Sequence, residues 1–184
     1  MTHERALRGS IDDYFARHPA ELHMLASLEP LLPLGASLLD RTHVPYHWTA
    51  SAWIVDASRE MALVLFHRKL QMWLQPGGHA DGNWDMPAVA LREAWEETGL
   101  RSLRLDSPTI FDFDITSIPA RIDMAAHAHL DVRYLLWADH AEPIVESAES
   151  NGVKWVPMAT LAVDADSGIR RMAMKTMALE PQPQ

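Results

Sequence analysis

The feature that most constrains this chain is a helix whose two ends are both marked in the sequence. Asp85 is a residue type that caps helix N-termini, and Pro87 follows it in the first turn, where proline is tolerated. Gly99 stands where a helix can end in the left-handed conformation, which glycine adopts at little steric cost. The sequence therefore predicts a helix over residues 86–98, preceded by a glycine loop over residues 75–82.

Three glutamates lie on one face of this predicted helix. Glu93, Glu96 and Glu97 are spaced i, i+3 and i+4, which brings their carboxylates together on the helix surface. Like charges at this spacing repel, so the helix gains from them only when a cation lies between them. Mg²⁺ and Mn²⁺ prefer oxygen ligands and leave positions for water and substrate phosphates. The pattern predicts a Mg²⁺ or Mn²⁺ site on this helix face.

Residues 77–100 resemble the Nudix box, a glycine-loop-helix signature written G-x5-E-x7-R-E-U-x-E-E-x-G-U, in which U is aliphatic. When the motif is aligned on its Arg-Glu pair, six fixed positions match: Gly78, Arg92, Glu93, Glu96, Glu97 and Gly99. Six identities at residue frequencies of about 6–7% coincide in one register roughly once in ten million trials. A chance match is therefore excluded in a chain of this length.

Two positions depart from the motif. Trp84 stands where the box has its first glutamate, with Asp85 beside it, and Ala94 stands at an aliphatic position. In the family the helix acids are the main metal ligands, whereas the first glutamate more often supports the loop. The departure at Trp84 therefore predicts a slower enzyme that still binds metal.

The resemblance implies hydrolysis of a phosphoanhydride bond in a nucleoside diphosphate linked to another moiety. It also implies that Glu93, Glu96, Glu97 and the carbonyl of Gly77 hold one to three Mg²⁺ or Mn²⁺ ions. Such ions would bind phosphate oxygens, lower the pKa of an attacking water and neutralise the charge that develops at phosphorus.

The remaining roles implied by the family fall on the box and on a later loop. Arg92 would orient a box glutamate, and Glu97 is the first candidate for the general base. Glu149, in a loop before a predicted strand, is the second candidate, with plain surface charge as its alternative. Gly78 and His79 are candidates for binding substrate; for His79 a structural hydrogen bond is the alternative.

A second polar pattern, His127-x-His129-x-Asp131-x-Arg133, alternates with apolar residues, so on a strand its four side chains share one face. This face is either a solvated outer surface or a wall of the cleft, where the side chains would bind phosphate or base. Two imidazoles and a carboxylate suit Zn²⁺ by ligand type. Strand spacing alone is a loose signal, however, and the sequence does not lead us to expect a dedicated zinc site.

Periodicity divides the chain into a helical leader and a mixed domain. Residues 1–45 predict a helical N-terminal extension packed on the domain, with helices over 10–17 and 21–32. Residues 46–180 predict the Nudix hydrolase domain. Its expected strands are 48–55, 61–67, 109–118, 127–137 and 153–156, the first two forming a hairpin, and a helix over 167–179 closes it. This order favours an α+β fold or an α/β/α sandwich with a mixed β-sheet.

Charge and composition limit the partners. With 16 Lys+Arg against 25 Asp+Glu, the formal charge is −9, and without a basic stripe nucleic-acid binding loses its main driving force. The isolated cluster His67-Arg68-Lys69 either steers an anionic substrate or is a solvated turn. Residues 1–8 carry charges where a signal peptide has an apolar run, and the apolar stretch 61–66 is far shorter than the ~20 residues of a membrane span.

We therefore expect a cytoplasmic enzyme with a small-molecule nucleotide-type substrate and with no nucleic-acid or membrane partner. Analogy with Nudix relatives adds a homodimer as a candidate assembly.

Two other interpretations stay open at this point. Trp84 favours a non-catalytic Nudix module that binds a nucleotide as a sensor or regulator, whereas the retained, mutually repelling glutamates favour catalysis. A Nudix-like isomerase of an allylic diphosphate would call for a cysteine in the usual place, and the chain has none.

Overall fold

The computed structural model describes residues 3–120, 124–145, 150–165 and 167–179. The leader is helical: α1 (His3–Arg17), η1 (Pro19–Glu21), α2 (Leu22–Leu28) and η2 (Glu29–Leu39). The strands are β1 (Tyr46–Val55), β2 (Met61–His67), β3 (Met72–Leu74), β4 (Gly77–His79), β5 (Arg104–Leu105), β6 (Asp112–Ile118), β7 (His127–Trp137) and β8 (Ser150–Pro157). The other helices are α3 (Met86–Thr98), α4 (Met158–Asp164) and α5 (Ser167–Met177).

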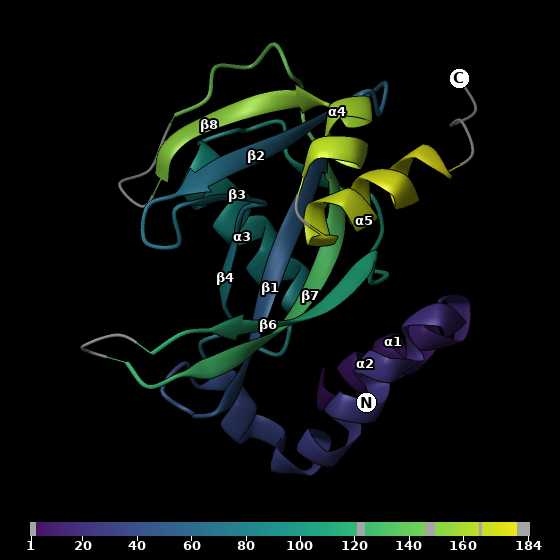
Figure 1. Ribbon diagram of the computed structural model, residues 1–184, viewed down its shortest axis with the longest axis vertical. Coiled ribbons are helices and arrows are strands. Elements are labelled where there is room, and N and C mark those ends of the chain that lie inside the picture. The colour runs from purple at the N-terminus through teal and green to yellow at the C-terminus, as the bar shows by residue number, and fades with distance from the viewer. Residues whose placement is uncertain (1–2, 121–123, 146–149, 166, 180–184) are drawn as a thin grey trace.

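The strands form one mixed sheet built around β1 (Figure 1). β1 pairs antiparallel with β2 and β4, and it pairs parallel with β7 over ten residue pairs, from Tyr46↔Ala128 to Val55↔Trp137. β6 and β5 are antiparallel to β7, and β8 is antiparallel to β2. The predicted mixed sheet with helices and the predicted β1–β2 hairpin are both confirmed.

Successive side chains of the strands point to opposite faces of the sheet, and buried apolar residues form a core cluster on each face. On β1, Trp48, Ala50 and Ile54 are buried in a cluster with α3, with the alternate residues of β7 and with the leader. Trp53 and Val55 point the other way and pack with α4 and α5. Figure 1 shows α5 and α3 on different sides of β1, so the sheet is sandwiched between helical layers.

Both predicted ends of α3 are present. The carboxylate of Asp85 accepts a hydrogen bond from the amide of Ala88 at 3.2 Å, so it caps the helix N-terminus. Gly99 ends the helix with φ 67° and ψ 4°, and its amide donates to the carbonyl of Trp95.

Replacing Gly99 with alanine should destabilise the fold by about 1–3 kcal/mol, because the left-handed backbone disfavours a Cβ. The added Cβ would also lie 2.7 Å from Cβ of Val145. Urea denaturation measures the change. Gly9→Ala is the matched control, because Gly9 lies inside α1 and a methyl group there would meet no neighbour within 4 Å; it should stabilise by about 0.5–1 kcal/mol. Equal effects of the two substitutions would contradict the argument.

Several element boundaries differ from prediction. α1 begins at His3, not at Ser10, because the Ser10 hydroxyl donates back to the carbonyl of Ala6 at 3.1 Å and does not cap a helix. The expected helix over 21–32 is only seven residues of α-helix, followed by the 3₁₀ segment η2, which contains Pro30 and Pro33. The short strands β3, β4 and β5 and helix α4 were not predicted.

The helical run Pro19–Leu39 has 21 residues and, by length and composition alone, could cross a membrane. Its backbone is not one continuous helix, because Gly35 breaks it with φ 53° and ψ −128°. Although only 22% of its most apolar 18-residue stretch is buried, Leu28, Leu38 and Leu39 belong to the core cluster that includes the sheet. In this fold the run is part of the packed leader at one end of the sheet, which makes it a weak candidate for a membrane span (Figure 1).

Candidate active site

A cleft of about 360 Å³ lies between α3, the glycine strand β4 and the polar face of the sheet. Its walls include every site residue predicted from the sequence except Glu149, which lies outside the described residues. These are Gly77, Gly78, His79, Arg92, Glu93, Glu96, Glu97, His127, His129, Asp131 and Arg133. The strand pattern and the box helix, about thirty residues apart in the chain, therefore face one cavity.

The three box glutamates differ in their surroundings. Glu97 is buried, and its Oε2 accepts a hydrogen bond from the amide of Gly77 at 2.9 Å. The side chain of Glu93 is 14% exposed and that of Glu96 is 48% exposed. The carboxylates thus form a series from the buried end of the cleft to solvent.

Arg92 links these acids to the glycine strand. Its guanidinium lies 2.9 Å from a carboxylate oxygen of Glu93 and 3.6 Å from one of Glu96. It also donates to the backbone carbonyl of His79 at 3.2 Å. One cation therefore contacts two of the glutamates and ties α3 to β4.

Glycine is needed in β4 because of how closely its neighbours approach. A Cβ on Gly78 would lie 2.4 Å from Cδ of Glu93, and a Cβ on Gly77 would lie 2.3 Å from Oγ of Ser51. The two glycines let β4 pass between the α3 carboxylates and β1. The sequence predicted this segment as a loop, because three residues with two glycines carry no strand signal.

The floor of the cleft is formed by side chains from β1 and β7 that share one face of the sheet. The parallel register places His47 beside His129, Thr49 beside Asp131 and Ser51 beside Arg133. The β7 residues were predicted from the sequence, whereas the β1 residues were not. The only signal that could have found them is the polar alternation His47, Thr49, Ser51 along an otherwise apolar strand.

Asp131 and Arg133 are buried and bonded to each other and to their neighbours. Nε of Arg133 donates to Asp131 at 2.7 Å, and Asp131 accepts from the hydroxyls of Thr49 at 2.9 Å and Ser51 at 2.8 Å. The other guanidinium nitrogens of Arg133 lie 3.0 Å from Asp112 and 3.2 Å from Asp114. These carboxylates hold the pKa of Arg133 above its ordinary value, despite burial that alone would lower it.

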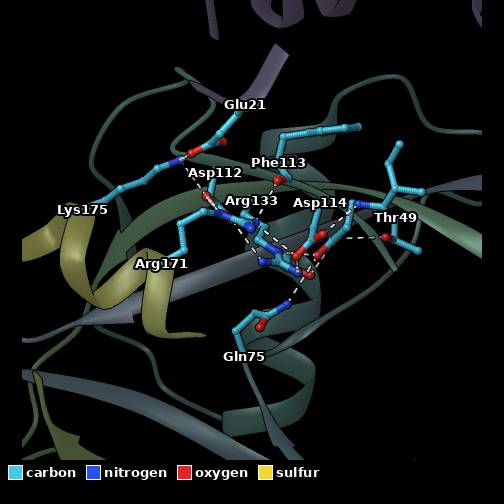
Figure 2. A network of polar contacts seen from close by, with 12 residues as sticks. Glu21, Thr49, Gln75, Asp112, Phe113, Asp114, Arg133, Arg171 and Lys175 are labelled. Carbon is cyan, nitrogen blue, oxygen red and sulfur yellow. Dashed lines mark hydrogen bonds and ion pairs between the residues drawn. The ribbon is translucent and has the colours of Figure 1, made fainter. Parts of the chain in front are cut away.

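A larger network of charges extends from Arg133 away from the cleft. Figure 2 shows Arg133, Arg171 and Lys175 converging on Asp112, which is fully buried. Arg171 donates to Asp112 at 2.8 and 2.7 Å, and Nζ of Lys175 donates to it at 2.7 Å. Lys175 also contacts Glu21 of the leader at 2.9 Å. The network therefore joins the leader, α5, β6 and the cleft floor.

Four histidines form a cluster, and three of them, His79, His127 and His129, line the cleft. The rings of His47, His79, His127 and His129 lie 4.9–5.2 Å from one another in all the pairs that are in contact. Burial lowers the pKa of His129 to about 3 and that of His79 to about 4, and it lowers the pKa of His47 as well. These three imidazoles are therefore neutral at pH 7.

Trp84, which stands where the Nudix box has its first glutamate, has a packing role in this structure. Trp84 is partly buried and packs against the main core cluster. Its neighbour Asp85 caps α3 through Ala88, so this carboxylate is engaged at the helix start.

Comparison with known proteins supports the same architecture. Residues 45–175 match the model of a family described as the NUDIX domain. An Ap4A hydrolase from C. elegans in a binary complex has a similar structure, with a TM-score of 0.57 and 20% identity over 71% of this chain and 95% of that one. A NUDIX-family hydrolase from Clostridium perfringens is similar, with a TM-score of 0.56 and 22% identity over 73% and 98% of the two chains. The dihydroneopterin triphosphate pyrophosphohydrolase of E. coli has a TM-score of 0.55 and 16% identity over 72% and 96%.

Proposed function

The chain belongs to the NUDIX domain family, and from this premise we propose that it is a metal-dependent pyrophosphohydrolase. The proposed reaction is hydrolysis of a phosphoanhydride bond in a nucleoside diphosphate linked to another moiety. The observation that carries the proposal is one cleft lined by Glu93, Glu96 and Glu97, with Arg92 between two of the acids. We further propose that residues 46–180 form the catalytic domain and that residues 1–45 are an extension packed on it.

The donor atoms in this part of the cleft suit hard divalent ions. Glu93, Glu96 and Glu97 supply carboxylate oxygens on one wall, and the carbonyl of Gly77 lies in the neighbouring strand. We propose that these four residues hold one to three Mg²⁺ or Mn²⁺ ions. When bound, such ions would neutralise phosphate charge and lower the pKa of a water molecule.

We assign the remaining catalytic roles to side chains of the protein. Glu97 is our candidate for the general base, since it is the buried acid and the amide of Gly77 holds one of its oxygens in place. Arg92 orients Glu93 and Glu96 through its two ion pairs. Glu149 remains the second candidate for the base.

The rest of the cleft supports binding of a small anionic substrate. His79, His127 and His129 present imidazoles to the cavity, and Asp131 and Arg133 shape its floor through their mutual hydrogen bond. His67 and Lys69 also line the cleft, and the ammonium of Lys69 places a positive charge near the substrate in a protein of net charge −9.

A substrate panel tests the proposed function. NDP-sugars, ADP-ribose, dinucleoside polyphosphates, nucleoside triphosphates, coenzyme A and CDP-alcohols are each incubated with the protein and Mg²⁺ or Mn²⁺, and phosphate release is measured. We expect hydrolysis of at least one compound and its loss on addition of EDTA. Binding across the panel with no turnover would instead support a nucleotide sensor, the alternative that Trp84 favours.

Replacing Gly78 with alanine should lower kcat/KM at least about tenfold, equivalent to about 1.4 kcal/mol in the activation barrier. The new Cβ would lie within 2.6 Å of both carboxylate oxygens of Glu93 and would displace them. Because these atoms are the end of a flexible side chain, the protein should still fold. Thermal melting and a titration with Mn²⁺ separate the two effects, and Gly9→Ala again serves as the control. Unchanged Mn²⁺ affinity and turnover would remove Glu93 from the proposed site.

A further inference from the structure

We propose that His47, His127 and His129 form a binding site for a transition-metal ion, Zn²⁺ in the first instance, distinct from the carboxylate site. One potential donor nitrogen from each of these imidazoles lies within 4.8 Å of the others. His47 and His129 are directly paired on the parallel strands β1 and β7, and His127 lies two residues before His129 on the same face. From the sequence we did not expect a zinc site at His127, His129 and Asp131, because strand spacing alone is a loose signal. In the structure Asp131 is bonded to Thr49, Ser51 and Arg133, and the neighbouring strand supplies a third histidine instead.

Hydrogen bonds to the backbone define which nitrogen of two rings can act as a ligand. Nδ1 of His47 lies 3.1 Å from the carbonyl oxygen of His43, and Nδ1 of His127 lies 2.9 Å from that of Ala125. A carbonyl oxygen only accepts hydrogen bonds, so each Nδ1 carries a proton and Nε2 is the nitrogen left to act as a ligand. Metal-binding histidines are held in this way, with one ring nitrogen bonded to a carbonyl and the other on the ion.

Two ring nitrogens of this histidine cluster have no protein partner among the described residues. Nε2 of His47 and Nε2 of His129 are buried and have no hydrogen-bond partner among the residues that the structure describes. His47 as a whole is fully buried. Leaving buried polar atoms unsatisfied is costly, and a ligand bound between the rings would remove that cost.

The donor set selects the class of ion. Imidazole nitrogens suit Zn²⁺ and other first-row transition-metal ions, whereas Mg²⁺ prefers carboxylate, carbonyl and water oxygens. The box glutamates and the histidines would therefore bind different ions. Tetrahedral Zn²⁺ with bonds of about 2.0–2.1 Å holds its nitrogen ligands roughly 3.4 Å apart. Binding would therefore draw the three rings closer together. The ring of His79 lies 5.1 Å from that of His47 and 5.2 Å from that of His129, which makes His79 a candidate for a fourth ligand.

Metal binding by the purified full-length chain tests this site without reference to activity. The protein is stripped with a chelator and titrated with Zn²⁺ in the presence of excess Mg²⁺, and the affinity is read by competition with a chromogenic zinc chelator. We expect one equivalent of Zn²⁺ to bind and to raise Tm. The affinity should fall at least about a hundredfold in His129→Gln. Failure of the wild-type chain to take up Zn²⁺ would overturn the proposal, whatever the variants do.

Two further variants locate the ion. His23→Gln is the matched control, because His23 is exposed on α2, and it should bind Zn²⁺ as the wild type does. The double variant Glu93→Gln, Glu97→Gln should keep its Zn²⁺ affinity while it loses hydrolysis. This outcome separates the histidine site from the proposed catalytic site. Loss of Zn²⁺ binding in that variant, with retention in His129→Gln, would assign the ion to the glutamates and overturn the proposal.

Because a buried histidine variant can fold poorly, Co²⁺ bound to the wild-type chain gives an independent reading. Visible absorption of Co²⁺ strengthens in tetrahedral nitrogen coordination and is weak in octahedral oxygen coordination. We expect the strong spectrum, displaced by one equivalent of Zn²⁺ and unaffected by Mg²⁺. A weak spectrum that Mg²⁺ abolishes would contradict a histidine site.

Discussion

Replacing Glu97 with glutamine is expected to lower kcat at least about a hundredfold, the scale on which removal of a general base slows a reaction. Glutamine keeps the shape of the side chain, and its amide oxygen can still accept the hydrogen bond from Gly77. What it removes is the negative charge, which is needed both to take a proton and to bind a cation. Steady-state kinetics on a compound identified in the panel measure the loss.

The control for this substitution is Glu29→Gln, an exposed glutamate of η2, which should leave kcat unchanged. Both variants should melt near the wild-type temperature, since glutamine is nearly isosteric with glutamate. If turnover in Glu97→Gln is undiminished, Glu97 is not the general base, and Glu149 becomes the first candidate.

The second large effect is expected in the charge network, where Asp112→Asn should destabilise the fold by about 3–5 kcal/mol. Asp112 is fully buried and is contacted by Arg133, Arg171 and Lys175 at 2.7–3.0 Å. Asparagine would remove the negative charge that these three cations share, at a position where the carboxylate and Arg133 are shielded from water. Urea denaturation measures the loss. Asp12→Asn, which breaks an exposed i, i+4 pair with Arg8, should cost at most about 0.5 kcal/mol.

The same carboxylate predicts a pH dependence. Burial alone would raise the pKa of Asp112, but hydrogen bonds from Arg171 and the charges of Arg133 and Lys175 hold it below its ordinary value. The unfolded chain therefore binds the proton more readily, so the stabilisation is fully present above the unfolded pKa of about 3.9 and is lost as pH falls through the lower folded value. The difference in stability between wild type and Asp112→Asn should be constant above about pH 5 and should shrink below pH 4. A difference that grows on acidification would contradict the assignment.

Local signals explain what could be predicted from the sequence. The ends of α3 depend on Asp85 and Gly99, which act on their own helix, and both were placed correctly. The bounds of β7 were also correct, because its polar and apolar residues alternate from His127 to Tyr134 and an apolar run completes the strand. The predicted start of α1 at Ser10 was wrong, because a serine hydroxyl can donate back to a carbonyl within a helix as well as cap one.

Contacts between distant segments explain what could not be predicted. The box residues were found because they are close in sequence, whereas His47 and His129 meet only through the register of two parallel strands. Likewise nothing near Asp112 in the sequence indicates that α5 will place Arg171 and Lys175 against it, some sixty residues later. Pairings of this kind are set by the whole fold, because the periodicity of one segment does not specify which distant segment it will pair with.

The hydroxyl of Tyr14 links the helical leader to β6 and α5. It accepts hydrogen bonds from the amide of Phe113 at 3.1 Å and from Nζ of Lys175 at 2.7 Å, and it donates to Glu21. The family match starts only at residue 45. A fragment that begins there would lack the phenol that contacts both β6 and α5, so we expect it to be less stable than the full chain.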